Sequence, residues 1–239
     1  MTQLLAIETS GEACSVALSW SGNVLQKHQH APLLHAGLLL PAVRSLLDEA
    51  GVSLNQLDAI VFGRGPGSFT SLRIGIGVVQ GLAWGAELPV VPVSSLAAVA
   101  QQLVWNCSAP LQCPAHILVA VDARMNEVFH CTYAVDVLGS LQELSPEEVS
   151  SPCSVYAIDP GATTAAGNGF ERYPELGALG RSLRGVHASL QPTASALLPL
   201  AEHWLRVHQA LPAAQAQPVY VRNQVATKPE MVKPWGSSE

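Results

Sequence analysis

The sequence predicts an α/β protein made of two similar lobes, each with a mixed β-sheet and flanking helices. Three observations support this prediction. Segments with strand-like and helix-like apolar spacing alternate along the 239 residues, and two pairs of strands are joined by tight turns. The strand–acid–turn–strand pattern of residues 4–20 returns at residues 118–135. Alternating elements are typical of α/β folds, and a repeated unit indicates two related halves.

The first half of the chain predicts the element order βββαβαβα. Residues 4–10 and 13–20 predict two strands around a tight Ser-Gly-Glu turn, and residues 23–30 predict a third strand. Residues 33–51 carry apolar side chains at helical spacing and end at a glycine, which predicts a helix and its stop. The other elements follow in order: a buried strand within 57–65, a helix in the glycine-rich stretch after it, a strand within 88–95 and a helix over 95–105.

The second half of the chain repeats the first incompletely. An offset of 114 residues places Asp122 on Glu8. After this repeat the pattern predicts a strand over 154–159, mostly loop over 161–177, a helix over 193–211 and a short extended piece over 219–224. We therefore expect three parts: residues 1–104 as the first lobe, residues 105–225 as a degenerate second lobe and residues 226–239 as a flexible tail.

The composition limits the classes of function. Apolar residues make up 49% of the chain and charged residues 13%, which favours buried packing and an interface with a partner. The net charge is −6, and residues 101–180 hold two basic and nine acidic side chains, so we do not expect the chain alone to bind a phosphate backbone. Five cysteines without a C-x-x-C pair argue against a disulfide framework and a cysteine metal site.

The start of the chain and its apolar segments bear on its location. The stretch "MTQLLAIETS" has no basic region and reaches Glu8 early, which is unlike a signal peptide. No window offers the roughly 18 uninterrupted apolar residues that a membrane helix needs. We therefore expect a cytoplasmic protein without membrane attachment.

Each predicted hairpin carries an acidic residue directly after its first strand, Glu8 in one and Asp122 in the other. Two such hairpins are typical of the actin-like, sugar-kinase and Hsp70 (ASKHA) fold, where the turns grip phosphates and the acids hold magnesium or activate water. The candidate cofactor-binding residues are therefore Glu8, Ser10, Gly11, Gly65, Gly67 and Ser68. The alternative is that both acids only cap their turns, and that Ser68 or Thr70 only caps the helix after the loop. The second turn, "DARMNE", is bulkier than the first and lacks glycine.

Few sequence signals indicate catalysis by this chain alone. The glycine-rich loop is not followed by the lysine of a P-loop. The histidines form no H-E-x-x-H motif and no i,i+4 pair, which argues against a metallopeptidase. No Ser/His/Asp set stands in the context of a strained nucleophile turn.

The helix after the glycine-rich loop gives a sharper signal. Gly77, Gly81 and Gly85 recur every four residues and therefore share one face. Each glycine costs a helix about 1 kcal/mol relative to alanine. A flat face of this kind lets another backbone approach closely. Either the helix packs closely within its own lobe, or it forms an interface with a second molecule.

These motifs together resemble the TsaB (YeaZ) family, the accessory subunit of the bacterial tRNA threonylcarbamoyladenosine (t6A) synthase. The resemblance is carried, in order, by "LLAIETSGEACSVAL", "FGRGPGSFTSLRIGIGVVQGLAWG", "VPVSSLAA", "AVDARMNEVF" and "PVYVRN", and covers essentially residues 3–225. Two positions depart from the family pattern, which usually has Asp where Glu8 stands and Gly where Ser71 stands.

The resemblance implies the ASKHA fold and a partnership with a catalytic paralogue, TsaD. That paralogue transfers a threonylcarbamoyl group from its adenylate to N6 of adenosine 37, in tRNAs that read codons beginning with A. Its metal is held by an H-x-x-x-H pair, and the matching positions here are Ser95 and Val99, which cannot replace imidazole on iron or zinc. The chain is thus expected to be a non-catalytic scaffold without a cofactor, with at most weak ATP or ADP binding inside the complex.

The resemblance also implies which partners the chain has and where they bind. They are a TsaD-like paralogue, a TsaE-like ATPase, a second copy of the chain when it is alone, and tRNA only through the complex. The first two helices of the first lobe would form the dimer surface, with interface residues Leu39, Leu40, Val43, Leu72, Arg73, Ile76, Gly77 and Gly81. The competing hypothesis is a nucleotide-binding small-molecule kinase of the same fold. The missing lysine, the bulkier second turn and "GNG" at residues 167–169 as the sole trace of an adenosine-binding turn argue against it.

Overall fold

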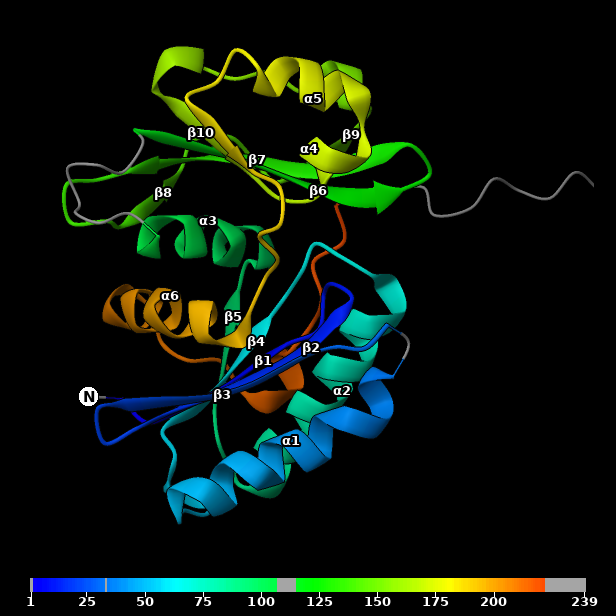
Figure 1. The fold of residues 1–239 in the computed structure, drawn as a ribbon. Coiled ribbons are helices and arrows are strands. Elements are labelled where there is room, and N and C mark those ends of the chain that lie inside the picture. Colours follow the sequence, from blue (N-terminus) through cyan, green and yellow to red (C-terminus); the bar gives the residue numbers. More distant parts are fainter. Residues whose placement is uncertain (1, 33, 107–114, 222–239) are drawn as a thin grey trace, which may run out of the picture.

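The computed structural model describes residues 2–32, 34–106 and 115–221. Two β-sheets are stacked, with helices outside and between them (Figure 1). The described helices are α1 (His35–Ala50), α2 (Phe69–Gly85), α3 (Ser95–Trp105), α4 (Gly169–Arg172), α5 (Pro174–Gly180) and α6 (Ala194–Val207). The first sheet consists of β1 (Leu4–Glu8), β2 (Ala13–Trp20), β3 (Asn23–His30), β4 (Ala59–Gly63) and β5 (Val90–Val93). The second consists of β6 (His116–Arg124), β7 (Glu127–Val135), β8 (Leu141–Glu143), β9 (Glu148–Ser150), β10 (Thr163–Ala166) and β11 (Gly185–His187).

The two sheets have the same topology. The first has the order β3-β2-β1-β4-β5, and the second has the order β8-β7-β6-β10-β11, with β9 beside β7. In each, the hairpin is antiparallel and the next two strands are parallel to its first strand. Glu8 ends β1 and Asp122 lies near the end of β6, as the internal repeat predicts. The predicted ASKHA architecture of two similar lobes with mixed sheets is therefore confirmed.

The elements of the first half match the prediction one by one. The strand β1 is buried along its whole length. In α1 the buried side chains Leu39, Val43 and Leu46 follow the predicted helical spacing and pack against the first sheet. The helix ends at Gly51, whose φ of 67° lies in the left-handed region that glycine adopts without strain. Apolar spacing and one glycine stop thus account for this part of the fold.

Two helices cross between the lobes, which the sequence did not show. The helix α6 comes late in the chain but packs on the first sheet, on the face opposite to α1 and α2. The helix α3 comes from the first half but packs on the second sheet. Figure 1 shows both helices in the layer between the two sheets. The predicted division at residues 104 and 105 is therefore not a division between packing units.

The prediction for the middle of the second half is partly wrong. Residues 154–159 form no strand, because Tyr156 and Ile158 are exposed and join no core. The strand that does join the sheet is β10, which consists of four small residues inside the segment predicted as mostly loop. The same segment also forms α4 and α5, and the three-residue strands β8, β9 and β11 were not predicted.

The last predicted helix and the predicted tail lie at the end of the second half. The helix predicted over 193–211 is confirmed as α6. The predicted tail of residues 226–239 lies outside the described residues, and so do residues 107–114, just after the predicted boundary between the lobes. Within the described part of the chain, no helix is both long and apolar enough to span a bilayer.

Candidate functional site

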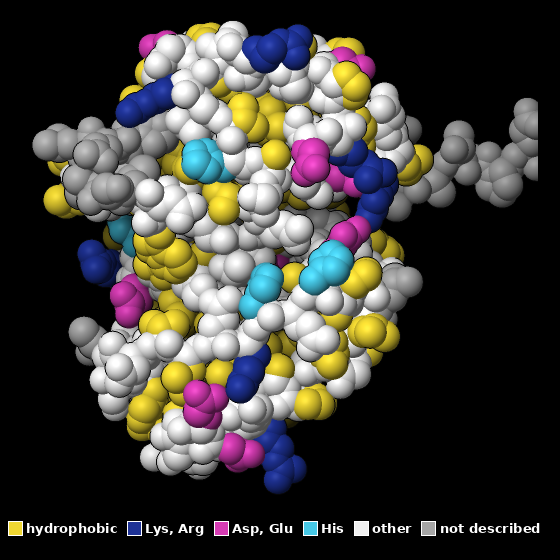
Figure 2. Space-filling model, viewed as in Figure 1, with side chains coloured by type: hydrophobic (Ala, Val, Ile, Leu, Met, Phe, Trp, Pro, Cys, Tyr) yellow, Lys and Arg dark blue, Asp and Glu magenta, His cyan; other side chains and the backbone are white. Residues whose placement is uncertain are grey.

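A cleft of about 500 Å³ lies between the two lobes. Its lining includes the turn of the β1–β2 hairpin, the loop before α2, the start of α3, the end of β6 and the connection into α6. Where the lobes meet, basic, acidic and histidine side chains gather on the surface (Figure 2). Of the predicted cofactor-binding residues, Ser10, Gly11, Gly67 and Ser68 line this cleft, whereas Glu8 and Gly65 are not part of its lining.

Glu8 is sealed inside the first lobe with 1% of its surface exposed. Its Oε1 accepts a hydrogen bond from the backbone N–H of Ser10 at 2.6 Å, and its Oε2 accepts one from Ser95 Oγ at 2.8 Å. Burial raises the pKa of the Glu8 carboxyl above its ordinary value, and the hydrogen bonds from Ser10 and Ser95 oppose that rise. Because both oxygens are bound inside the lobe, Glu8 caps its own turn. It is not part of the cleft lining.

Glycines allow the loop before α2 to lie against the first hairpin. The N–H of Ser68 donates to the carbonyl oxygen of Ser10 at 2.8 Å. A Cβ at Gly67 would lie 2.5 Å from that same oxygen, and one at Gly63 would overlap the carboxylate of Glu8. Close packing of the loop on the hairpin therefore explains these glycines without a phosphate.

Two further loop residues have local backbone roles. Gly65 has a φ of +94°, which side-chain-bearing residues rarely adopt. Ser68 occupies the N-cap position of α2, but its hydroxyl donates to Ser71 Oγ at 3.0 Å and makes no capping hydrogen bond. Ser68 is therefore the N-cap residue, as predicted, but its side chain does not make the capping hydrogen bond.

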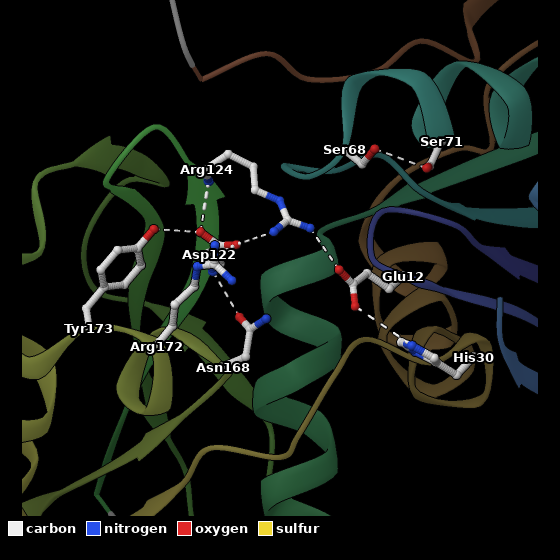
Figure 3. A network of polar contacts seen from close by, with 9 residues as sticks. All are labelled: Glu12, His30, Ser68, Ser71, Asp122, Arg124, Asn168, Arg172 and Tyr173. Atoms are coloured by element: carbon white, nitrogen blue, oxygen red, sulfur yellow. Dashed lines mark hydrogen bonds and ion pairs between the residues drawn. The ribbon is translucent and has the colours of Figure 1, made fainter. Parts of the chain in front are cut away.

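Asp122 of the second hairpin is surrounded by donors from its own lobe (Figure 3). Its Oδ1 accepts hydrogen bonds from the N–H of Arg124 at 2.9 Å and from the hydroxyl of Tyr173 at 2.6 Å. Its Oδ2 lies 3.2 Å from Arg124 Nη1 and 3.2 Å from Arg172 Nε. Burial, and then the hydrogen bond to Asp122, raise the pKa of Tyr173, so its phenol stays protonated and donates. Both oxygens of the Asp122 carboxylate are thus occupied by donors of its own lobe, so Asp122 stabilises the turn of the second hairpin.

The two hairpin acids make the same local contact. Glu8 accepts from the N–H two residues later, and Asp122 does the same. Both acids therefore cap their own turns, as the alternative predicts. The second turn differs in its backbone, because Arg124, Met125 and Asn126 all have positive φ.

The "GNG" turn at residues 167–169 has a structural explanation. A Cβ at Gly167 would overlap the carbonyl oxygen of Ala120, and one at Gly169 would lie 2.9 Å from it. The side chain of Asn168 accepts a hydrogen bond from the N–H of Asp122 at 2.9 Å. The turn therefore packs on β6 and fixes the second hairpin, although Asn168 also lines the cleft.

The predicted interface residues divide into two groups. Leu39, Val43, Leu72 and Ile76 are buried in the first lobe, so assigning them to a partner surface is wrong for this conformation. They carry the apolar spacing that holds α1 and α2 on the sheet. The other predicted interface residues, Leu40, Arg73, Gly77 and Gly81, are exposed. A Cβ added at Gly77, Gly81 or Gly85 would meet nothing within 4 Å.

The two positions matched to a metal-binding pair lie apart from solvent. Ser95 is 1% exposed and its hydroxyl donates to Glu8, while Val99 is fully buried in the core between α3 and the second sheet. In the described part of the chain, no three His, Cys, Asp or Glu side chains are placed so that they could hold a metal ion. Neither a serine hydroxyl bound to a carboxylate nor a valine offers the donors that zinc or iron prefers.

Sequence reasoning missed two clusters that involve arginine. Arg64 Nη1 pairs with Glu147 Oε2 of the second lobe at 2.9 Å, and Glu147 also accepts from Ser94. On the exposed side of α2, the guanidinium of Arg73 lies 3.6 Å from the ring centre of Phe69, and its Nε donates to the hydroxyl of Tyr220 at 3.0 Å. Both arginines stand inside the glycine-rich motif. Phe69 is only four residues from Arg73, but Glu147 and Tyr220 are too distant in sequence for a local pattern to reveal them.

The sequence of this chain is similar to a known protein family and to named relatives. A family model described as "TsaD: tRNA N6-adenosine threonylcarbamoyltransferase" matches residues 29–176. A protein of Escherichia coli (strain K12) named "tRNA threonylcarbamoyladenosine biosynthesis protein TsaB" is 38% identical, over 95% of this chain and 97% of its own length. A protein of the same name from Haemophilus influenzae is 37% identical, over 94% of this chain and 95% of its own length.

A solved structure agrees with these sequence matches. The structure described as "YeaZ from Pseudomonas aeruginosa" superimposes with a TM-score of 0.83 at 44% identity. The match covers 92% of this chain and all of the other chain. Sequence and fold therefore agree over nearly the whole length of this chain.

Proposed function

The chain belongs to the TsaB (YeaZ) family, and from this membership we propose that it takes part in t6A modification of tRNA as a non-catalytic subunit. Its partner is a TsaD-type paralogue that transfers threonylcarbamoyl from threonylcarbamoyl-AMP to N6 of adenosine 37, in tRNAs reading ANN codons. The match of the TsaD family model to residues 29–176 supports a common origin with such a paralogue.

The observation that carries the proposal is the outer face of α2. Gly77, Gly81 and Gly85 are exposed and have open space where a Cβ would stand, so packing within the lobe does not require them. Three glycines at these sites destabilise an isolated helix by roughly 3 kcal/mol relative to alanine. A helix from another molecule lying closely against this face is a sufficient reason for them. Leu40 and Trp84, which are 50% and 73% exposed, add apolar surface on the same two helices.

The chemistry of the cleft supports a non-catalytic role. Glu8 is bound on both oxygens inside the lobe, and Asp122 is held by two arginines and a tyrosine. Neither acid is free to hold magnesium or activate water. We expect ATP to bind the isolated chain with a dissociation constant on the order of 0.1 mM or weaker, which corresponds to at most about 5–6 kcal/mol.

The other partners follow from the same proposal. The chain forms a homodimer through the α1 and α2 face when it is alone, and a TsaE-like ATPase joins the assembled complex in the cytoplasm. The net charge of −6 disfavours direct binding of tRNA, so tRNA is bound through the complex.

Reconstitution tests this proposal. Threonylcarbamoyl-AMP and an unmodified tRNA reading ANN codons are incubated with this chain, with a TsaD-type paralogue, and with both proteins. We expect modified nucleoside only when the paralogue is present, and more of it when both are present. Modification by this chain alone, or one tightly held zinc or iron per chain, would overturn the non-catalytic assignment. Sub-micromolar ATP binding with turnover would favour the kinase alternative instead.

A further inference from the structure

An ion pair joins the two hairpins across the mouth of the cleft. Arg124 Nη2 of the second hairpin lies 2.8 Å from Glu12 Oε1 of the first. These residues are 112 positions apart and lie on the hairpins of different sheets. Figure 3 shows the guanidinium lying between the two lobes, with Asp122 on one side and Glu12 on the other. Both Glu12 and Arg124 also line the cleft itself.

The conformation of the second hairpin directs the side chain of Arg124 toward Glu12. Its turn takes the left-handed conformation at Arg124, Met125 and Asn126, with φ values of 62°, 53° and 58°. This conformation is unfavourable for residues with side chains and persists where surrounding contacts fix it. Asp122 provides such contacts, because its side chain is 4% exposed and binds both the backbone N–H and the guanidinium of Arg124. The orientation of Arg124 is therefore set by contacts within its own hairpin and does not depend on Glu12.

The charges at the cleft mouth are balanced. Arg124 and Arg172 face Asp122 and Glu12, so two cations meet two carboxylates. The ring of His30 lies 3.9 Å from the second oxygen of Glu12, Oε2. This balance favours a contact that joins the lobes over a site for an external anion.

A second ion pair between the lobes provides a contrast. Arg64 and Glu147 have side chains that are 24% and 6% exposed, and breaking a pair of this kind leaves a buried charge without its partner. Arg124 and Glu12 are 60% and 48% exposed, so water replaces their contact readily. The Arg64–Glu147 pair is therefore the more costly of the two to break, and the Arg124–Glu12 pair the less costly.

We propose that Arg124 is a reversible ionic latch that holds the two lobes closed over the cleft. Its guanidinium bridges Asp122 of the second hairpin and Glu12 of the first, so the closed state is stabilised by this chain's own side chains and requires no bound ligand. Opening of the cleft then follows the breaking of this one contact, while the Arg64–Glu147 pair keeps the lobes joined.

Hydrogen exchange followed by mass spectrometry tests the latch. The variants are Arg124→Met, which keeps an apolar stem, Glu12→Gln, and the two combined. The readout is the exchange rate of the backbone amides of residues 9–11 and 67–69, which form no hydrogen bond or ion pair with Asp122. We expect each single variant to raise these rates roughly two- to fivefold, the range for an exposed ion pair. The double variant should exchange no faster than either single variant, because both remove the same contact.

A matched control is Arg44→Met, which breaks an exposed ion pair with Asp48 within α1 and should leave these rates unchanged. High salt should speed exchange in the wild type and leave Glu12→Gln unaffected. If Arg124→Met accelerates exchange only within its own hairpin and Glu12→Gln changes nothing, the latch is refuted. Should Arg124→Met fail to fold, Glu12→Gln decides alone, because it leaves every contact of Asp122 in place.

Discussion

Within residues 63–85, six of the seven glycines form two groups with opposite surroundings. Gly63, Gly67 and Gly75 face the first hairpin, and a Cβ at any of them would overlap or crowd the atoms of that hairpin. Gly77, Gly81 and Gly85 face outward, and a Cβ at any of them would meet nothing within 4 Å. The first group allows close contact inside the lobe. The second group has no such role in the folded chain.

This difference separates two kinds of constraint that look the same in the sequence. Gly75 and Gly77 are two residues apart on one helix, so they have the same intrinsic effect on helix stability. Substituting each with alanine then compares packing inside the lobe with packing against another molecule. The inner group should control folding, and the outer group should control association.

The largest effect on the stability of the folded chain is expected for Gly75→Ala. The new Cβ would overlap Thr9 Oγ1 and lie 3.1 Å from Thr9 Cγ2. Thr9 cannot swing away freely, because its hydroxyl donates to the carbonyl oxygen of Ser71 at 3.0 Å. Overpacking of a tight site costs about 1–3 kcal/mol, and we expect a net loss of unfolding free energy in this range. Urea denaturation at pH 7 measures it. A variant as stable as the wild type would mean that the hairpin and α2 are not packed as tightly as described.

The same inner region predicts a pH effect through Glu8. Burial raises its pKa above the ordinary value of 4.5, so above pH 4.5 the folded state binds more protons at this site than the unfolded state. The contribution of Glu8 to stability therefore falls as pH rises from 4.5 through the folded-state pKa. Relative to the wild type, Glu8→Gln should become progressively more stable over this window. Urea midpoints at pH 5, 6 and 7 give the trend.

The matched control for this experiment is Glu49→Gln, at a surface carboxylate that pairs with Lys27. Its charge is solvated by water, so no comparable trend is expected. A constant difference between Glu8→Gln and the wild type at all three pH values would contradict the buried-carboxylate interpretation.

How far the sequence could predict the fold depended on local pattern. The buried strand β1, the amphipathic helix α1 and the glycine at its end follow from apolar spacing and backbone preference alone. The strand β10 did not, because its four residues are small and no large apolar side chain marks it. Tyr156 and Ile158 led to the opposite error, the prediction of a strand that does not form, since they have strand propensity but remain exposed.

How far the sequence could predict the candidate site depended on distance along the chain. The two acids and their turns were found, because each cap spans two residues. The partners of those turns were not, because Arg124 and Glu12 are 112 residues apart. The crossing of α3 and α6 between lobes has the same cause. Spacing reveals which face of a helix is apolar but gives no information about which sheet that face covers.

The outer face is tested by Gly81→Leu. A leucine there projects into space that a second helix backbone would occupy at an interaxial distance of about 8–10 Å. The clash should cost about 1–3 kcal/mol for each copy of the site, and a two-fold interface contains two copies. The variant should stay folded, elute as a monomer and lose binding to the TsaD-type paralogue in co-purification. His203→Leu, at an exposed position on α6, is the control and should bind as the wild type does.

An unfolded Gly81→Leu protein, with normal dimerisation in the fraction that survives, would mean that this face packs inside the lobe. The partner surface would then have to be sought on α1 alone.

The smallest effect on stability is expected for Gly77→Ala. It is the same substitution as Gly75→Ala, made two residues later on the same helix. The new methyl group meets no atom of the lobe, so the helix gains roughly 0.5–1 kcal/mol from the lower backbone entropy of the unfolded chain. Urea denaturation of a monomeric form, such as the Gly81→Leu background, measures this gain without the interface. Binding to the paralogue should weaken slightly, because the same methyl group stands between two closely packed helices. One substitution thus stabilises the free chain and weakens the complex. If Gly77→Ala instead destabilises the monomer, the outer glycines contact the lobe in solution, and the distinction between the two groups fails.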